Sequence, residues 1–217
     1  MNSTVYNEDC IQGMKRYKDK HFDLAIVDPP YGINRDGQKL SICKNPKHNR
    51  KEHKKKGWDF AIPNENYFTE LFRVSQNQII WGGNYFTEYL NPTRGWVFWY
   101  KGQNDLTMSD GEMAWTSFNK VTRQVEINRA ELIKQKTFHP TEKPIKLYKW
   151  LLHNYAKQGD LILDTHLGSG SSRIACHKYG FDFTGFELDK EYYEAQEKRY
   201  NDFISQLNIF DNKNIAV

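Results

Sequence analysis

The stretch that most constrains the fold is Leu24 to Tyr31, where four apolar residues lead directly into Asp28-Pro29-Pro30-Tyr31. The apolar run predicts a buried strand. The prolines predict its end, because proline lacks the N–H that a central strand needs and its ring fixes φ. In an α/β fold that point is the edge where ligands bind, so a carboxylate and an aromatic ring are expected there. A plain strand end before a Pro-Pro turn has the same pattern, and only the rest of the chain can distinguish the two.

The 217 residues suit one α/β domain, residues 1–217, with little left over for a second. No run of about 20 apolar residues occurs, and the polar start is unlike a signal peptide, so we expect a cytoplasmic protein with no membrane partner. The three cysteines have no paired spacing, which predicts neither a disulfide framework nor a zinc ribbon. With a net charge of only +4, any surface for a polyanion must come from local clustering.

Hydrophobic periodicity predicts alternating strands and helices. The strand ending at Asp28, a helix over 66–76 and a strand over 78–81 form a β-α-β crossover, which implies parallel strands. Strands at 96–100 and 112–115 are joined by a hairpin-like turn and are expected to be antiparallel. Residues 119–138 are polar and without period, which predicts an irregular excursion. The remaining strands are expected at 4–6, 161–164 and 183–187, and the remaining helices near Ile11, Asn84, Pro144, Arg173 and Asp189.

A basic segment, residues 33–57, leaves the Asp28–Tyr31 turn without a hydrophobic period and holds nine basic residues against two acidic ones. It predicts a mobile loop. A charge run is often only a solvated tail, but its position beside the turn favours a loop that closes over a polyanion. The residues expected to contact that polyanion are Lys44, Lys47, Arg50, Lys51, Lys54, Lys55 and Lys56.

A second constellation joins a strand, a glycine turn, a helix and a further strand. Asp164 ends the first strand, Gly168 and Gly170 follow, and Glu187 ends the next strand 19 residues after Gly168. Glycines let the backbone approach a ligand at a helix N-terminus, and an acid on the next strand accepts hydrogen bonds from ribose hydroxyls. The third glycine of a dinucleotide fingerprint is missing, so a nucleoside cofactor is favoured over a pyrophosphate ligand.

Together these features resemble the amino-methylating, S-adenosylmethionine-dependent DNA methyltransferases, and among them the β group, whose catalytic motif precedes the cofactor motif. The resemblance covers nearly the whole chain. Its four ordered segments are Tyr6 to Cys10, Asp28 to Tyr31, His139 to Pro144 and Asp164 to Ser172. It implies a three-layer Rossmann-like methyltransferase fold with permuted chain order, in which a mostly parallel seven-stranded sheet carries one antiparallel strand.

The resemblance also implies the site residues and partners. Asp28, Pro29, Pro30 and Tyr31 are expected to be catalytic. S-Adenosylmethionine is the expected cofactor, and the partner is double-stranded DNA with a flipped target base, within a restriction-modification setting and with a homodimer as one arrangement. The expected cofactor residues are Asp9, Cys10, Asp28, His139, Thr141, Lys143, Asp164, His166, Gly168, Ser169, Gly170, Ser171, Ser172, Glu187 and Leu188.

The chemistry of an exocyclic amino group fits this turn. Its lone pair is delocalised into the base, and accepting its hydrogens on the Asp28 carboxylate and the Pro29 carbonyl favours the geometry that frees the lone pair. Tyr31 is expected to stack on a base flipped out of the duplex. The aspartate form of the motif is more typical of adenine N6 enzymes, so adenine N6 is the expected target. The alternatives are transfer to cytosine N4 or to RNA, and a catalytically silent DNA-binding relative.

Several residues keep two interpretations. His166 stands where the family usually has phenylalanine, as an aromatic contact to the cofactor or as a structural residue. Lys143 approaches the cofactor carboxylate or the DNA backbone, or is a solvated lysine at a helix start. Cys10 is a cofactor contact rather than a nucleophile, because its acidic neighbours disfavour the thiolate. Residues 119–138 make a reduced target-recognition segment. Cys43, His48 and His53 lack a fourth ligand, so no metal is expected.

Overall fold

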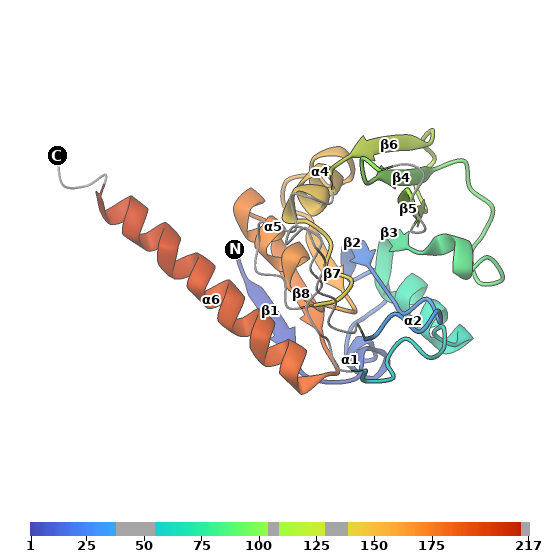
Figure 1. Ribbon diagram of the computed structural model, residues 1–217, viewed down its shortest axis with the longest axis horizontal. Helices are drawn as coiled ribbons and strands as arrows, with labels where there is room; N and C mark the ends of the chain where they lie inside the picture. Colours follow the sequence, from blue (N-terminus) through green and yellow to red (C-terminus); the bar gives the residue numbers. More distant parts are fainter. Residues whose placement is uncertain (38–54, 104–108, 129–138, 214–217) are drawn as a thin grey trace, which may run out of the picture.

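An eight-stranded sheet in the order β1-β8-β7-β2-β3-β5-β4-β6 organises the part of the chain that the structure describes (Figure 1). The structure is a computed structural model that describes residues 1–37, 55–103, 109–128 and 139–213. Every paired neighbour is parallel except that β5 runs antiparallel to both β3 and β4. The strands are β1 (Ser3–Tyr6), β2 (Phe22–Val27), β3 (Ser75–Trp81), β4 (Trp96–Tyr100), β5 (Gly111–Thr116), β6 (Arg123–Glu126), β7 (Leu161–Asp164) and β8 (Asp182–Phe186).

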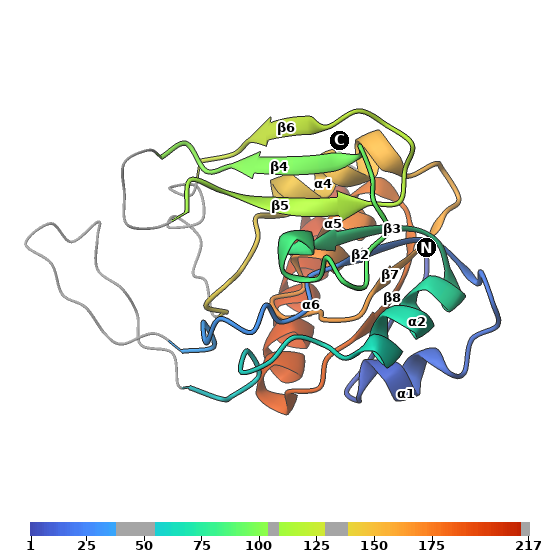
Figure 2. The same ribbon diagram turned by 90° about the vertical axis from the view of Figure 1, so that its right-hand side faces the viewer.

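Helices cover both faces of the sheet, because side chains alternate along the central strand β2. Leu24 and Ile26 point into a core shared with α4 and α5, whereas Ala25 and Val27 point into a core shared with α1 and α2. Figure 2 shows α1 and α2 in front of the sheet and α4 to α6 behind it. The helices are α1 (Cys10–Met14), α2 (Glu65–Val74), η2 (Gly83–Tyr85, a 3-10 helix), α4 (Ile145–Tyr155), α5 (Ser171–Tyr179) and α6 (Lys190–Lys213).

Polar residues set where these helices begin. Asp9 accepts a hydrogen bond from the Gln12 N–H at the start of α1, and Asn64 accepts one from the Tyr67 N–H at the start of α2. Pro144 stands at the N-cap of α4, where its missing N–H costs nothing. Among the described residues, no helix has the length and apolar character that crossing a bilayer requires.

The predicted architecture is confirmed, with two corrections. The sheet has eight strands rather than seven, because Arg123–Glu126 pairs in parallel with β4 inside a segment predicted to be irregular. Only Val125 of this strand is buried, so its sequence carries no period. The helix predicted near Asn84 is only the single turn η2. The β2-α2-β3 crossover is parallel and the β4-β5 pair is antiparallel, as expected.

Strand direction decides which residues meet at the ligand edge. The carboxyl ends of β1, β2, β7 and β8 lie side by side there, because these four strands are parallel. They bring Asp9, Asp28, Asp164 and Glu187 to one edge of the sheet. β5 runs the other way, so its first residues arrive at the same edge.

Candidate active site

The Asp28–Tyr31 turn leaves β2 at the ligand edge and presents a carboxylate tied to its own tyrosine. The Tyr31 hydroxyl donates to Asp28 Oδ1 at 2.6 Å. The Tyr31 ring stacks on Tyr85 with centroids 5.0 Å apart, and Gly82 leaves room for the ring, since a Cβ at Gly82 would lie 2.2 Å from it. The Asp28 side chain retains 18 % exposure and so remains accessible.

Lys143 supplies the second bond to Asp28, across 115 residues of chain. Its ammonium donates to Asp28 Oδ2 at 2.5 Å and lies 3.1 Å from Glu112 Oε2. The Lys143 side chain is only 2 % exposed, so the solvated interpretation of this lysine is wrong. Lys101 pairs with the other Glu112 oxygen at 2.6 Å. Two carboxylates and two ammonium groups therefore alternate from Asp28 to Lys101.

These contacts set the charge state of the site. Burial raises the pKa of Asp28, against the attraction of Lys143, which lowers it. Burial also disfavours the charged form of Glu112, but Lys143 and Lys101 outweigh it and bring that pKa to about 2. Burial lowers the pKa of Lys143, but its two carboxylate partners prevail and the pKa is raised overall, so Lys143 stays protonated.

Two further aspartates fix the backbone on either side of the basic segment. Asp59 accepts hydrogen bonds from the amides of Tyr31, Gly32 and Arg35, at 2.8, 2.9 and 2.6 Å. Asp36 accepts from the amides of Lys56 and Gly57. The chain that leaves the Asp28–Tyr31 turn is thus bound to the chain that returns after the basic segment. The sequence analysis missed both aspartates.

A cavity of about 540 Å³ opens beside Asp28, within the usual range of about 300–1,000 Å³ for small-molecule sites. Its walls come from the segment after β1, the Asp28–Tyr31 turn, the His139–Lys143 segment, the glycine turn after β7 and the end of β8. The predicted cofactor residues that line it are Asp9, Cys10, Asp28, His139, Thr141, Lys143, His166, Gly168, Ser169, Glu187 and Leu188.

The carboxylate of Glu187 ties the glycine turn to the end of β8 through hydrogen bonds to two backbone amides. Glu187 Oε2 accepts from the Gly168 N–H at 2.8 Å, and Oε1 accepts from the Asp189 N–H at 2.9 Å. Gly168 takes a φ of +51°, a conformation that favours glycine. Burial raises the pKa of Glu187, and the hydrogen bonds from these two amides oppose that rise.

Four predicted cofactor residues lie in the protein interior instead. Asp164 is buried, accepting from the His166 N–H at 3.0 Å and from the Ser172 hydroxyl at 2.5 Å. Ser171 is buried with its hydroxyl on Ser169, and Gly170 packs against Gln196 of α6. These residues shape the glycine turn through hydrogen bonds and packing.

His166 and Cys10 are both uncharged cavity residues. Burial lowers the pKa of His166 to about 4, so the ring is neutral at pH 7. Its Nδ1 lies 2.9 Å from Thr165 Oγ1, and its ring meets Tyr67 edge-on. Burial and the charge of Asp9 raise the pKa of Cys10 to about 12, which keeps the thiol protonated and disfavours a nucleophilic role.

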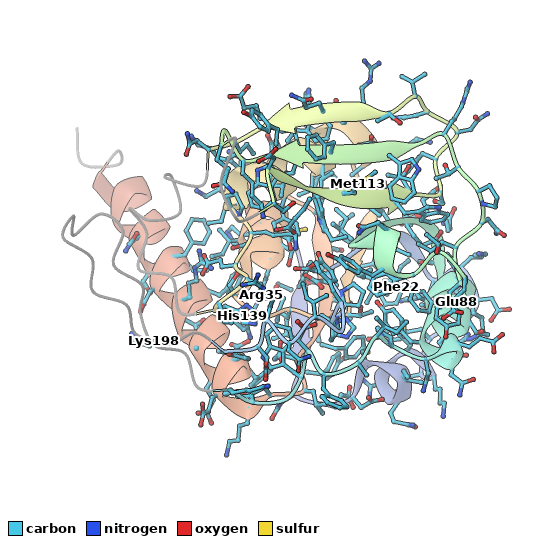
Figure 3. All side chains as sticks on the ribbon, turned by 45° about the vertical axis from the view of Figure 1, so that its right-hand side comes forward. Phe22, Arg35, Glu88, Met113, His139 and Lys198 are labelled. Atoms are coloured by element: carbon cyan, nitrogen blue, oxygen red, sulfur yellow. The ribbon has the colours of Figure 1, made fainter. Side chains whose placement is uncertain are left out.

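An aromatic wall that the sequence analysis missed faces the glycine turn. Trp58 stacks on His139, and His139 lies 4.5 Å from Tyr192 of α6, centroid to centroid. In Figure 3, His139 lies between the sheet and α6. A lone tryptophan at the end of a basic, polar segment was the signal available in the sequence.

Lys56 belongs to this wall, and its assignment to DNA binding stays a prediction. Its ammonium lies 2.7 Å from Asp189, 2.8 Å from Glu191 and 4.2 Å from the centre of the Tyr192 ring. Lys56 lines the cavity, whereas Lys55 is exposed. The other residues predicted to contact DNA, Lys44, Lys47, Arg50, Lys51 and Lys54, lie outside the described residues, as do Cys43, His48 and His53.

Comparisons with known proteins agree with this geometry. A family model described as DNA methylase matches residues 41–198, about three quarters of the chain. The Type II methyltransferase M2.MboI of Moraxella bovis is 24 % identical over 95 % of this chain and 90 % of its own. The M1.HpyAVI–SAM complex superposes with a TM-score of 0.58 at 19 % identity, over 90 % of this chain and 98 % of its own. The cytosine-N4-specific PvuII DNA methyltransferase superposes with a TM-score of 0.61 at 13 % identity, over 92 % and 86 %.

The matched region begins after Tyr31, so it includes the His139–Lys143 segment and the glycine turn but not the turn that carries Asp28. The cavity fits an S-adenosyl group, since an acceptor carboxylate and a tight glycine turn face it from adjacent parallel strands. The chain belongs to the DNA methylase family of amino methyltransferases, which use S-adenosylmethionine.

Proposed function

We propose that this protein methylates N6 of adenine in double-stranded DNA, on a base that has left the duplex. The observation that carries the proposal is the Asp28 carboxylate, held at a strand end, partly exposed, and lining the cavity. S-Adenosylmethionine, when bound, supplies an electrophilic methyl group. The protein contributes acceptors for the amino hydrogens, one on Asp28 and one on the Pro29 carbonyl.

Glu187, the glycine turn and the aromatic wall are proposed to hold the cofactor. Glu187 already fixes the Gly168 amide, and its remaining lone pairs suit ribose hydroxyls. Trp58, His139 and Tyr192 offer ring faces to a flat base, and Lys56 joins this wall to the start of α6. Replacing Glu187 with glutamine tests this placement, because titration of the cofactor alone should then show weaker binding.

The target base is proposed to stack on the Tyr31 side of the site. Enzymes that modify a base must take it out of the stack to reach the reacting atom. Tyr85 covers one face of the Tyr31 ring, so a base stacking on Tyr31 has to use the other face or displace Tyr85. Tyr85 is itself partly exposed and can act as the outer platform.

Adenine is favoured by the aspartate form of the turn, and cytosine N4 is the second candidate because of the PvuII enzyme's similar fold. Incubating unmethylated DNA with labelled S-adenosylmethionine, digesting it to nucleosides and measuring their masses decides between them. N6-methyldeoxyadenosine supports the proposal, and N4-methyldeoxycytidine replaces it with the second candidate.

Asp28→Ala tests the assigned role of the carboxylate. We expect methyl transfer to be lost while the cofactor dissociation constant, measured without DNA, stays within about threefold, because few cofactor contacts depend on one carboxylate. Glu126→Gln, on the edge strand β6, is a control for the loss of one negative charge. An equal loss of transfer and cofactor affinity in Asp28→Ala would contradict the role.

A further inference from the structure

Glu112 is placed at the ligand edge by the one antiparallel strand of the sheet. It is the second residue of β5 and pairs with Trp99, near the carboxyl end of β4. Because β5 runs against its neighbours, a residue at its start arrives where the parallel strands end. Its backbone pairs with β4 on one side, and the Gly82 amide donates to the carbonyl of the next residue, Met113, on the other, so Glu112 lies on an ordered strand.

The carboxylate of Glu112 competes with Asp28 for one ammonium group. Lys143 lies 2.5 Å from Asp28 and 3.1 Å from Glu112, and the Tyr31 hydroxyl lies 3.5 Å from Glu112. Lys101 holds the opposite oxygen of Glu112 at 2.6 Å. Lys143 is therefore shared between two acids, and the acid that does not face the cavity has a cation of its own.

We propose that Glu112 is a positioning residue for methyl transfer: by sharing Lys143, it leaves Asp28 with net negative charge directed at the target amino group. This inference rests on the proposed function of Asp28. During transfer, positive charge moves onto the amino nitrogen, and a lysine neutralising Asp28 alone would oppose that change. With Glu112 present, the four paired groups Asp28, Lys143, Glu112 and Lys101 carry no net charge, whereas without Glu112 the remaining three carry one positive charge beside the target amino group.

Other ionisable groups around Asp28 also affect how methyl transfer depends on pH. Tyr31 and Lys143 contact it directly, and Lys101 reaches it only through Glu112. Within the described part of the chain, further ionisable groups that interact with Asp28 come from α2, α4 and β7: Tyr67, Tyr148 and Asp164.

Glu112→Gln is the first variant, because it keeps the shape and removes the charge. Lys143 then serves Asp28 alone. We expect kcat for labelled methyl transfer to unmethylated DNA to fall roughly tenfold, with cofactor affinity unchanged, since an electrostatic contribution to the transition state is lost. We also expect the acid limb of the pH profile of kcat to move to lower pH by about one unit. Glu126→Gln, the same change on the exposed edge strand β6, should move neither quantity.

Lys101→Met gives the opposite perturbation and guards against a folding defect in Glu112→Gln. Without Lys101, Glu112 draws Lys143 more strongly, and the acid limb should move to higher pH. If the contacts of Glu112 only stabilise the fold, both variants should have a lower thermal midpoint of unfolding and an unshifted acid limb in the pH profile of kcat. That result would overturn the inference.

The double variant Lys143→Met/Glu112→Gln tests whether Glu112 acts through Lys143, because the direction of the change in kcat depends on it. In the Lys143→Met background, Glu112 only repels Asp28, so adding Glu112→Gln should leave kcat equal or raise it, whereas alone it lowers kcat. Additive losses overturn the positioning role while leaving the proposed function intact. If the wild-type protein itself transfers no methyl group, the proposed function fails instead.

Discussion

Replacing Asp164 with asparagine should change how the stability of this protein depends on pH. Burial raises the pKa of Asp164 to about 7, against hydrogen bonds from Ser172 and the His166 amide. In an unfolded chain the pKa of aspartate is about 3.9. Between these two values the folded state holds a proton that the unfolded state releases, so the free energy of unfolding falls as pH rises. Over about three pH units the loss amounts to about 4 kcal/mol.

The asparagine variant does not titrate and can keep both hydrogen bonds, with its carbonyl oxygen on the His166 amide and its NH₂ on Ser172. The unfolding free energy of the wild type minus that of Asp164→Asn should therefore fall by about 4 kcal/mol between pH 4 and pH 8.5. Urea unfolding without cofactor, at a series of pH values, measures this difference. Asp202→Asn, which removes an exposed carboxylate on α6, is the control. A difference that stays constant with pH refutes the reasoning.

Three further perturbations test the site. Tyr31→Phe removes the hydroxyl that donates to Asp28. We expect kcat to fall roughly tenfold at unchanged cofactor affinity, because hydrogen bonds to charged groups are worth about 1.5–3 kcal/mol. An unchanged kcat in a transfer assay would exclude a contribution of this hydrogen bond to catalysis. Lys56→Met removes the ion pair with Asp189 and should weaken cofactor binding roughly fivefold. The salt dependence of DNA binding should stay unchanged, and a smaller slope would show that Lys56 contacts DNA. His166→Phe should bind cofactor within about threefold of wild type above pH 5, because its pKa of about 4 leaves the ring neutral there; a much larger loss in calorimetry would show that a ring nitrogen is used.

Local pattern was enough to place the acids at strand ends, because an apolar run that gives way to a proline turn or to a helix cap marks where a strand ends. Asp28 and Glu187 both follow directly from such runs, and both line the cavity. Pattern was not enough for β6, where only Val125 is buried. Nor could it separate Lys55 from Lys56 within a run of like charges, although one is exposed and the other is paired with α6.

Pairings across the chain were the harder part. Lys143 and Asp28 lie 115 residues apart, and nothing local to the His139–Pro144 segment indicates that its lysine turns inward to a strand end. Asp59 has the same character, because it holds amides 24 to 28 residues away. Such contacts depend on how the elements pack, which hydrophobic period does not specify.

Glu112 lies between these two cases, and strand direction shows why. The β4-β5 pair was predicted to be antiparallel, and the structure shows that β5 is the strand that also runs against β3, so β5 begins at the ligand edge. A charged second residue in a strand that is otherwise buried at Ala114 and Trp115 needs a partner, because an unpaired carboxylate there is costly. Its partners are Lys101, just beyond β4, and Lys143, from the segment before α4, which also pairs with Asp28. An antiparallel strand beside parallel ones thus brings a second carboxylate next to the first, while the lysine that the two share comes from the way the segment before α4 packs against the sheet.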